Sequence, residues 1–297
     1  MPCARFHIDL QGSRQRTAAF SLVEILTAMA ILSMIVFTLA TLANVAGNIW
    51  EQGENQNQHR QRARAVLDVL SRELRSAMLG VAEFPSNPAD PAAPVDKTLQ
   101  LIINPPVSSS YRNRDSIFWQ APIATDTAQG DLAEIGYFIR WTGKQASLCR
   151  FFVNPSDPDY QIYQNPNGWL SDGLIEKIAP ADKAHQYRGL FLENVIGLWV
   201  TPRSFRSDGT VAPAQDGSDT HRYDSRATTP NALPSVVEVS LVLLDSSTAK
   251  QLQTPGQVTS LYSSSDTAEA FVDALPDNLR QGASIVRNTI ALRSESP

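Results

Sequence analysis

The sequence predicts an α+β protein in which a long N-terminal helix, apolar in its first half and amphipathic in its second, packs on an antiparallel β-sheet head. Three observations predict this class. Residues 25–50 include no charged side chain, apolar residues recur at helical spacing over 66–78, and segments rich in β-branched and aromatic residues follow from residue 98. A chain of 297 residues is long enough for the head to have its own core.

The composition is that of a globular protein and excludes two classes. With 25 basic and 30 acidic residues, the chain has a net charge of −5 and lacks the basic excess of a nucleic-acid-binding protein. We therefore expect no nucleic-acid partner. A mean hydropathy of −0.20 excludes a polytopic membrane protein but is compatible with one membrane segment.

The uncharged run 25–50 is the candidate membrane segment. As a helix it would be about 39 Å long, enough to cross a hydrocarbon layer of about 30 Å. The leader before it carries Arg5, Arg14 and Arg16 against Asp9. Because positive charge is retained in the cytoplasm, we expect a cytoplasmic N-terminus and an exported remainder.

Glu24 interrupts the apolar pattern at the start of this run, four residues after Phe20. A carboxylate at the centre of a bilayer costs about 2.5–3.5 kcal/mol, so it normally has a partner and a function. The alternative is an interfacial carboxylate that the helix macrodipole favours by up to about 1 kcal/mol. The residue taken alone leaves both interpretations open.

The string AFSLVE over 19–24, preceded by Arg14 and Arg16 and followed by the apolar run, resembles the prepilin signal of type IV pilins and type II secretion pseudopilins. The resemblance implies cleavage between Ala19 and Phe20 by a membrane prepilin peptidase, which also N-methylates Phe20. Glu24 then becomes the fifth residue and is expected to neutralise the new amine of a neighbouring subunit. Ala19 departs from the commoner Gly before the cut.

The resemblance also implies a domain organisation and a structural, non-enzymatic function. We expect a leader over 1–19, a transmembrane assembly helix over 20–50, its amphipathic continuation over 51–80 and an extracytoplasmic β-rich head over 81–297. Such a subunit sits in the inner membrane with a periplasmic head. It joins other pilin-like subunits in a pseudopilus or pilus, and its expected place is near the tip.

Three further segments resemble the J-type minor pseudopilin and the minor pilin PilW: LDVLSRELRSAM, the hairpin EIGYFIRW…LCRF and LPSVVEVSLVLLD. Two other interpretations of the N-terminus compete with the prepilin one. A secretory signal peptide would be cut near Val45-Ala46-Gly47, although its apolar core is usually only about 7–15 residues long. A plain signal anchor would hold an extracytoplasmic hydrolase or binding protein, but it does not account for Glu24.

The amphipathic half of the helix has no large apolar side chain over 51–64. Apolar residues then recur at three- and four-residue spacing, which predicts one core-facing side. We expect a bend or local melting at Gly47 or Gly53, and an end at Gly80 with the proline-rich run after it. The residues of the stripe are Val66, Leu67, Leu70, Leu74, Ala77 and Met78.

The head is predicted to be one antiparallel sheet. A turn at 142–144 predicts a hairpin between two of the strands. Asp266 and Glu269 predict a capping box that opens a short helix over 267–275. The strands are expected at 98–104, 116–120, 132–141, 147–153, 195–201, 236–244 and 283–292. The long connections 81–97 and 203–234 are either mobile surface loops or partner contacts.

No catalytic residue, metal site or cofactor is predicted. Residues 247–250 match the S-x-x-K string of penicillin-binding proteins, but no accompanying KTG or SDN string exists. The histidines His7, His59, His185 and His221 have no zinc spacing. The acidic pairs Asp157/Asp159 and Asp216/Asp219 lack a calcium-loop pattern, and Cys149 in a strand-like run is expected to be an inert thiol rather than a nucleophile.

Overall fold

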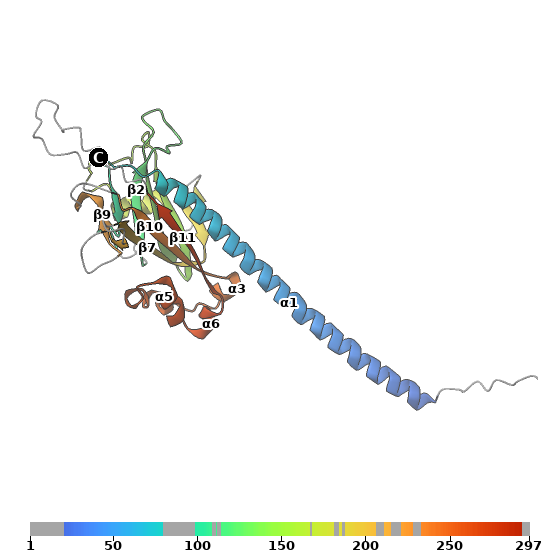
Figure 1. Cartoon of the computed structure of the whole chain (residues 1–297). Helices are drawn as coiled ribbons and strands as arrows, with labels where there is room; N and C mark the ends of the chain where they lie inside the picture. The colour runs from blue at the N-terminus through green and yellow to red at the C-terminus, as the bar shows by residue number, and fades with distance from the viewer. Residues whose placement is uncertain are drawn as a thin grey trace, which may run out of the picture. The chain divides into compact units, whose positions relative to one another are not determined.

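The computed structural model confirms the α+β class (Figure 1). It describes residues 21–79, 99–108, 111, 114–166, 168–180, 184–185, 188–205, 211–214, 221–227 and 233–292. The chain forms two units, Met1–Gln52 and Gly53–Pro297. Helix α1 (Leu22–Arg75) belongs to both, and each unit is described by itself below.

The first unit consists of the apolar part of α1. The stretch Leu22–Gly47 is long and apolar enough to cross a membrane, and none of it is buried within the chain. The helix continues without interruption through Gly47 and Gly53, so the predicted melting at these glycines is not observed. Trp50 follows the apolar stretch and is 80% exposed.

The second unit begins with the amphipathic part of α1. Leu67, Leu70 and Leu74 of the predicted stripe are at most 2% exposed, as is Ala63 one turn earlier, which confirms a core-facing side. Met78, also predicted in the stripe, lies beyond the helix end and is 41% exposed. The helix ends at Arg75, before the predicted stop at Gly80, because the chain leaves it to meet the head. The amide of Met78 donates to the carbonyl of Gln120 in strand β2 (Ser116–Ala121) over 3.0 Å.

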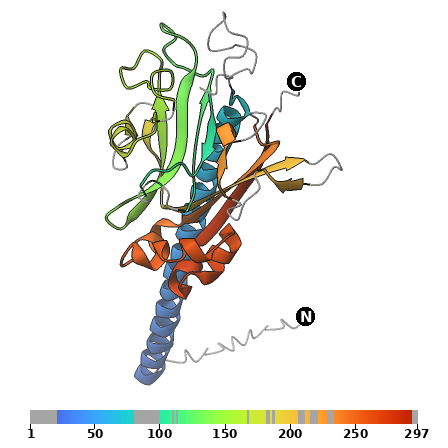
Figure 2. The same ribbon diagram turned by 90° about the vertical axis from the view of Figure 1, so that its left-hand side faces the viewer.

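The head contains two antiparallel sheets where the sequence predicted one (Figure 2). The larger, which we call the large sheet, has the order β5-β6-β4-β3-β2-β1-β9, and the small sheet has the order β11-β10-β7-β8. The large sheet consists of β1 (Leu101–Ile103), β2 (Ser116–Ala121), β3 (Ala133–Thr142), β4 (Gln145–Val153), β5 (Ala184–His185), β6 (Arg188–Glu193) and β9 (Tyr223–Asp224). The small sheet consists of β7 (Val195–Phe205), β8 (Val211–Pro213), β10 (Val236–Leu244) and β11 (Ala283–Ala291).

The predicted hairpin joins β3 to β4, with Thr142 opposite Gln145 and Gly143 at a φ of +58°. The predicted connection 203–234 includes the end of β7 together with β8 and β9. The connection 81–97 lies outside the described residues. Short helices complete the head: α2 (Asp172–Ile178), α3 (Ser246–Ala249), α4 (Gly256–Thr259), α5 (Ala268–Ala274) and α6 (Asp277–Arg280), with 3-10 turns at Ser225–Ala227 and Tyr262–Ser264.

Helix α5 begins one residue later than the predicted capping box requires. Thr267, not Asp266, is its N-cap, and the Thr267 side chain accepts a hydrogen bond from the amide of Ala270. The carbonyl of Asp266 instead faces Nε2 of His221 at 3.0 Å. The prediction of a helix here is therefore right, and that of its cap is wrong.

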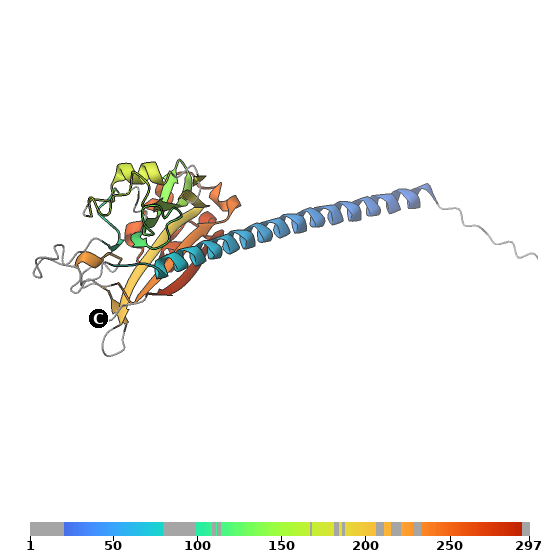
Figure 3. The same cartoon turned by 90° about the horizontal axis from the view of Figure 1, so that it is seen from above.

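Both faces of the large sheet are buried. One face packs on the small sheet and on α1, where Tyr137 and Ile135 meet Leu70 and Leu241 in one core cluster. The opposite face packs under α2, which lies beside this sheet in Figure 3, and forms a second core cluster around Phe118. Strands β2 and β4 are therefore apolar on both sides, which explains why their sequences lack strict alternation.

Candidate functional site

The predicted processing residues, Ala19 and Phe20, lie outside the described part of the chain. Glu24 is described and lies in the first turn of α1. Its Oε2 accepts from the amide of Ser21 at 3.3 Å, and its own amide donates to Ser21 Oγ at 3.2 Å. This reciprocal pair is a capping box, and its sequence signal is the S-x-x-E spacing of Ser21 and Glu24.

The apolar side chains after Glu24 are not packed against any other described part of the chain. All described side chains over Leu22–Gly47 are exposed, among them Phe37 at 70% and Met34 at 71%. A helix that is apolar on every side is stable only when lipid or other protein covers it. Glu24 therefore places one carboxylate at the end of an apolar helix surface, and lipid or another protein must cover that surface.

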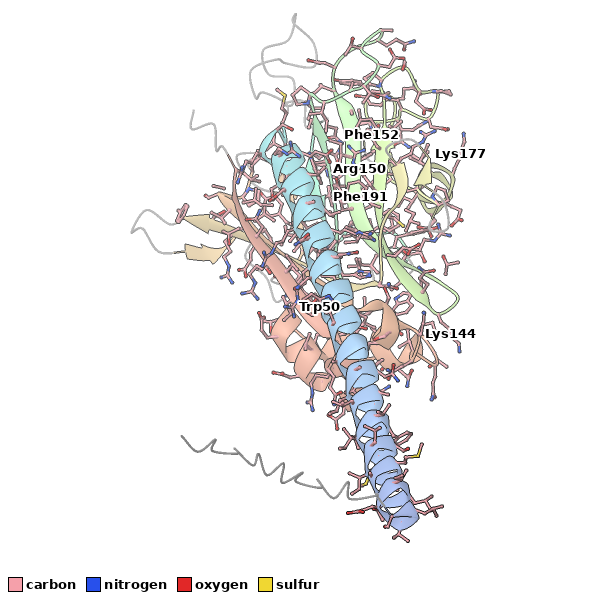
Figure 4. The ribbon with its side chains drawn as sticks, turned by 90° about the vertical axis from the view of Figure 1, so that its right-hand side faces the viewer. Trp50, Lys144, Arg150, Phe152, Lys177 and Phe191 are labelled. Atoms are coloured by element: carbon pink, nitrogen blue, oxygen red, sulfur yellow. The ribbon has the colours of Figure 1, made fainter. Side chains whose placement is uncertain are left out.

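In the head, a buried ion pair fixes α1 to the large sheet. Arg150 on β4 donates to Glu73 through Nη2 (2.6 Å) and Nε (3.3 Å), and the Tyr137 hydroxyl donates to Glu73 Oε2 over 2.7 Å. Figure 4 shows Arg150 beside α1 with Phe152 and Phe191, and its guanidinium lies 4.3 Å from the Phe152 ring centre. Burial and the neighbouring Glu73 charge raise the pKa of Tyr137 well above its usual value. These groups position the helix on the sheet.

A second buried carboxyl, Glu134 on β3, holds a loop in place. Its Oε1 accepts from the amides of Gln161 and Ile162 at 2.9 and 2.8 Å. Within the described part of the chain its Oε2 has no hydrogen-bond partner. Burial raises the pKa of Glu134 to about 8, which favours the protonated form of this carboxyl in the folded head.

His221 joins two segments of the head through both ring nitrogens. Nδ1 lies 3.0 Å from Asp115 Oδ2, and Nε2 lies 3.0 Å from the carbonyl of Asp266. Burial alone would lower the pKa of His221, but the hydrogen bond and the charge of Asp115 outweigh it and raise this pKa. Since both nitrogens face acceptors, the imidazole is bound as a structural bridge and is not free to act as a base.

The nearest arrangement to hydrolase chemistry is His59 on α1 beside Ser246 on α3, with Nε2 and Oγ 2.7 Å apart. A nucleophile and base pair also needs a group that orients the imidazole. Within the described residues, Nδ1 of His59 has no hydrogen-bond partner. Ser247 of the S-x-x-K string donates to Asp245, the cap of α3, over 2.6 Å. The geometry supports a contact between α1 and α3.

The acidic pair Asp157/Asp159 lies in the 154–166 loop, and both carboxylates form ion pairs with basic side chains. Asp157 pairs with Arg188 at 3.0 Å, and Asp159 pairs with Lys177 at 2.5 Å. Asp216 and Asp219 lie outside the described residues. In the described ranges, no three His, Cys, Asp or Glu side chains are grouped closely enough to hold a metal ion.

Comparisons with known proteins give only distant likenesses among solved structures. No protein-family profile matches the sequence, and no curated protein matches it significantly. Among solved structures, the chain is similar to a type IV-like pilin from Thermus thermophilus, with 11% identity and a TM-score of 0.35. The alignment covers 78% of this chain and 95% of the pilin.

Proposed function

We propose that the chain is a structural subunit of a type IV pilin-like filament, either a minor pseudopilin of a type II secretion system or a minor pilin, placed near the filament tip. One observation carries the proposal. Glu24 stands in the first turn of a helix whose next apolar residues, through Gly47, are exposed within the chain. Assembly with other apolar helices would cover that surface and provide the carboxylate with a partner.

In this proposal the precursor is inserted in the inner membrane with its N-terminus in the cytoplasm and its head in the periplasm. Prepilin peptidase cuts between Ala19 and Phe20 and methylates Phe20. The resemblance of the string over 19–24 to a prepilin signal supports this processing. The second unit has a core cluster to which only residues from Ala63 onward contribute. This supports separate roles for the apolar assembly helix and for the head.

The capping box refines the role of Glu24. In the isolated chain its carboxylate satisfies the amide of Ser21. In the filament it would instead face the positively charged amine of a neighbouring subunit, where opposite charges attract strongly in a low dielectric. Glutamine can replace glutamate in a capping box but carries no charge, so Glu24→Gln separates the two roles.

The test has two parts, performed on the full chain in a host with an active prepilin peptidase. Intact-mass analysis should find a chain that starts at methylated Phe20. Glu24→Gln should be inserted and processed normally but should fail to enter filaments, whereas Ser21→Ala, which loses the cap and keeps the charge, should assemble. A chain that retains residues 1–19 would overturn the proposed processing, and normal assembly of Glu24→Gln would overturn the charge role.

A further inference from the structure

An open groove of about 720 Å³ runs along the outer edge of β11. We call it the β11 groove; it is lined by Arg60, Arg64, Leu67 and Asp68 of α1, Val272 of α5 and residues 283–288 of β11. All of these belong to the second unit. Figures 1 and 4 show that this part of α1 and β11 run side by side.

The contacts of two adjacent β11 residues place the groove at the edge of the sheet. Asn288 donates to Ser71 Oγ of α1 over 2.7 Å on one face. Arg287 pairs with Glu269 of α5 on the other face. Residues from both faces line the same groove, so α1 and α5 form its two sides and the strand edge forms its base.

The backbone at this edge is available for pairing. β11 is the terminal strand of the small sheet, with β10 as its neighbour. Leu292 donates to the Ser235 carbonyl and Gly282 accepts from the Asp245 amide, both at 3.0 Å, so the even-numbered residues bond toward β10. In an antiparallel ladder the alternate residues then direct their N–H and C=O groups outward. Ala283, Ile285 and Arg287 do so along the groove.

The charge on the α1 side favours an acidic occupant. Arg60 and Arg64 are exposed, and within the described residues no carboxylate lies at ion-pair distance from either. Arg287 is already paired with Glu269 and with Glu238, and Glu238 is shared with Arg203. Asp68 also lines the groove, one turn beyond Arg64. The α1 side of the groove therefore carries two unpaired guanidinium groups against one carboxylate, which is an excess of positive charge.

The spacing of the two arginines matches an extended chain. Residues four apart on a helix are about 6 Å apart along its axis, and alternate residues of a strand are about 6.8 Å apart. A strand added to β11 would direct alternate side chains toward Arg60 and Arg64, and the others toward Val272. We propose that the β11 groove binds an extended segment of a partner protein in which acidic and apolar residues alternate. This binding adds to the filament role but does not require it.

The test uses the full chain in detergent micelles and a fluorescent peptide, TEVEVET. Anisotropy titration should show saturable binding, and Arg60→Glu with Arg64→Glu should weaken it at least about 10-fold. The matched control is Arg62→Glu, an exposed arginine outside the groove, which should change the affinity less than about 2-fold. TKVKVKT and a TEVEVET peptide with N-methylated backbone amides should not bind, because they lack the charge and the strand pairing respectively.

Each contrary outcome overturns a stated part of the proposal. Absence of saturable TEVEVET binding at about 1 mM excludes such an occupant. Equal losses for Arg62→Glu and the double variant indicate general attraction to anions, as to an anionic lipid surface. Unchanged binding of the N-methylated peptide excludes strand addition. Self-association that requires Arg60 and Arg64, measured by ultracentrifugation, assigns the groove to a second copy. The peptide assay is independent of leader cleavage, so its failure leaves the filament proposal standing.

Discussion

Ser21 and Glu24 cap each other at the start of α1, the Ser21 amide donating to Glu24 Oε2 and the Glu24 amide donating to Ser21 Oγ. A carboxylate in this first turn also interacts favourably with the helix macrodipole. The residue proposed to act between subunits is thus held in a defined orientation within its own chain.

Loss of this cap should make the start of α1 fray. Replacing an N-cap serine by alanine costs about 1 kcal/mol of helix stability, which is about a 5-fold change in an opening equilibrium. In Ser21→Ala we expect about 5-fold faster hydrogen exchange at the Glu24 amide of the full chain in micelles. Ser33→Ala, which removes a hydroxyl that bonds only within the helix at Met29, is the control. Equal exchange in wild type and Ser21→Ala would contradict the cap.

The Glu73–Arg150 pair should dominate the attachment of α1 to the large sheet. The Arg150 side chain is 6% exposed, so Glu73→Ala leaves a buried charge without its partner and should cost about 3–5 kcal/mol of unfolding free energy. Tyr137→Phe removes one hydrogen bond to Glu73 and should cost about 1–2 kcal/mol. Urea unfolding followed by tryptophan fluorescence measures both.

Two comparisons test this interpretation. Arg72→Ala, on the exposed side of the same helix, should change the unfolding free energy by less than about 0.5 kcal/mol. Glu73→Leu combined with Arg150→Met should be more stable than Glu73→Ala, because no charge then remains buried. A double variant as unstable as the single one would show that shape, not charge, fixes the helix.

Glu134 should make the head less stable as the pH rises. Burial raises the pKa of its carboxyl to about 8 in the folded chain, above its ordinary value of 4.5. Between these values the folded state binds a proton that the unfolded state has released. This contribution to stability is therefore complete below about pH 4.5 and is lost as the pH approaches about 8.

Glu134→Gln should remove that part of the pH dependence, because glutamine keeps the oxygen that accepts from Gln161 and Ile162 but does not titrate. Unfolding free energies of wild type and variant are compared at about pH 5 and about pH 8. The variant should lose less stability than wild type over this interval. Parallel losses would mean that Glu134 is already ionised in the folded head at neutral pH.

Gly136 should not accept a side chain. A Cβ at this position on β3 would lie 2.1 Å from the ring of Phe118, which is its cross-strand neighbour on β2. Gly136→Ala should cost about 1–3 kcal/mol of unfolding free energy through overpacking, and Phe118→Leu should restore part of it. Gly173→Ala is the control, since no atom lies within 4 Å of its Cβ and alanine favours helix α2. A fully tolerated Gly136→Ala would contradict this packing.

The sequence predicted the elements whose patterns are local. The strand over 236–244 and the core-facing side of α1 are both confirmed, although the strand is buried on both faces from Ser240 to Leu244. It did not predict strands such as β5 and β9, which are two residues long and are fixed by their neighbours in the sheet. The division into two sheets depends on strand pairing, which no local pattern encodes.

The distinction between local patterns and long-range contacts also holds for the site. Glu24 could be selected from the sequence because a charge in an apolar run is a local anomaly. The partnership of Glu73 and Arg150 joins residues 77 positions apart, and each alone reads as an ordinary surface charge. The clue would have been Glu73 within the apolar stripe that ends at Met78. Ala19 and Phe20 as processing residues remain predictions.

The buried Cys149 makes the wild-type head a ready background for site-directed labelling. It is the one cysteine in the described part of the chain, it is 0% exposed, and burial raises the pKa of its thiol to about 12. The thiolate is the form that reacts with thiol reagents, so near neutral pH we expect this cysteine to remain unlabelled. Cysteines introduced along α1 or β11 would therefore report cross-links between neighbours with no need to replace Cys149 first.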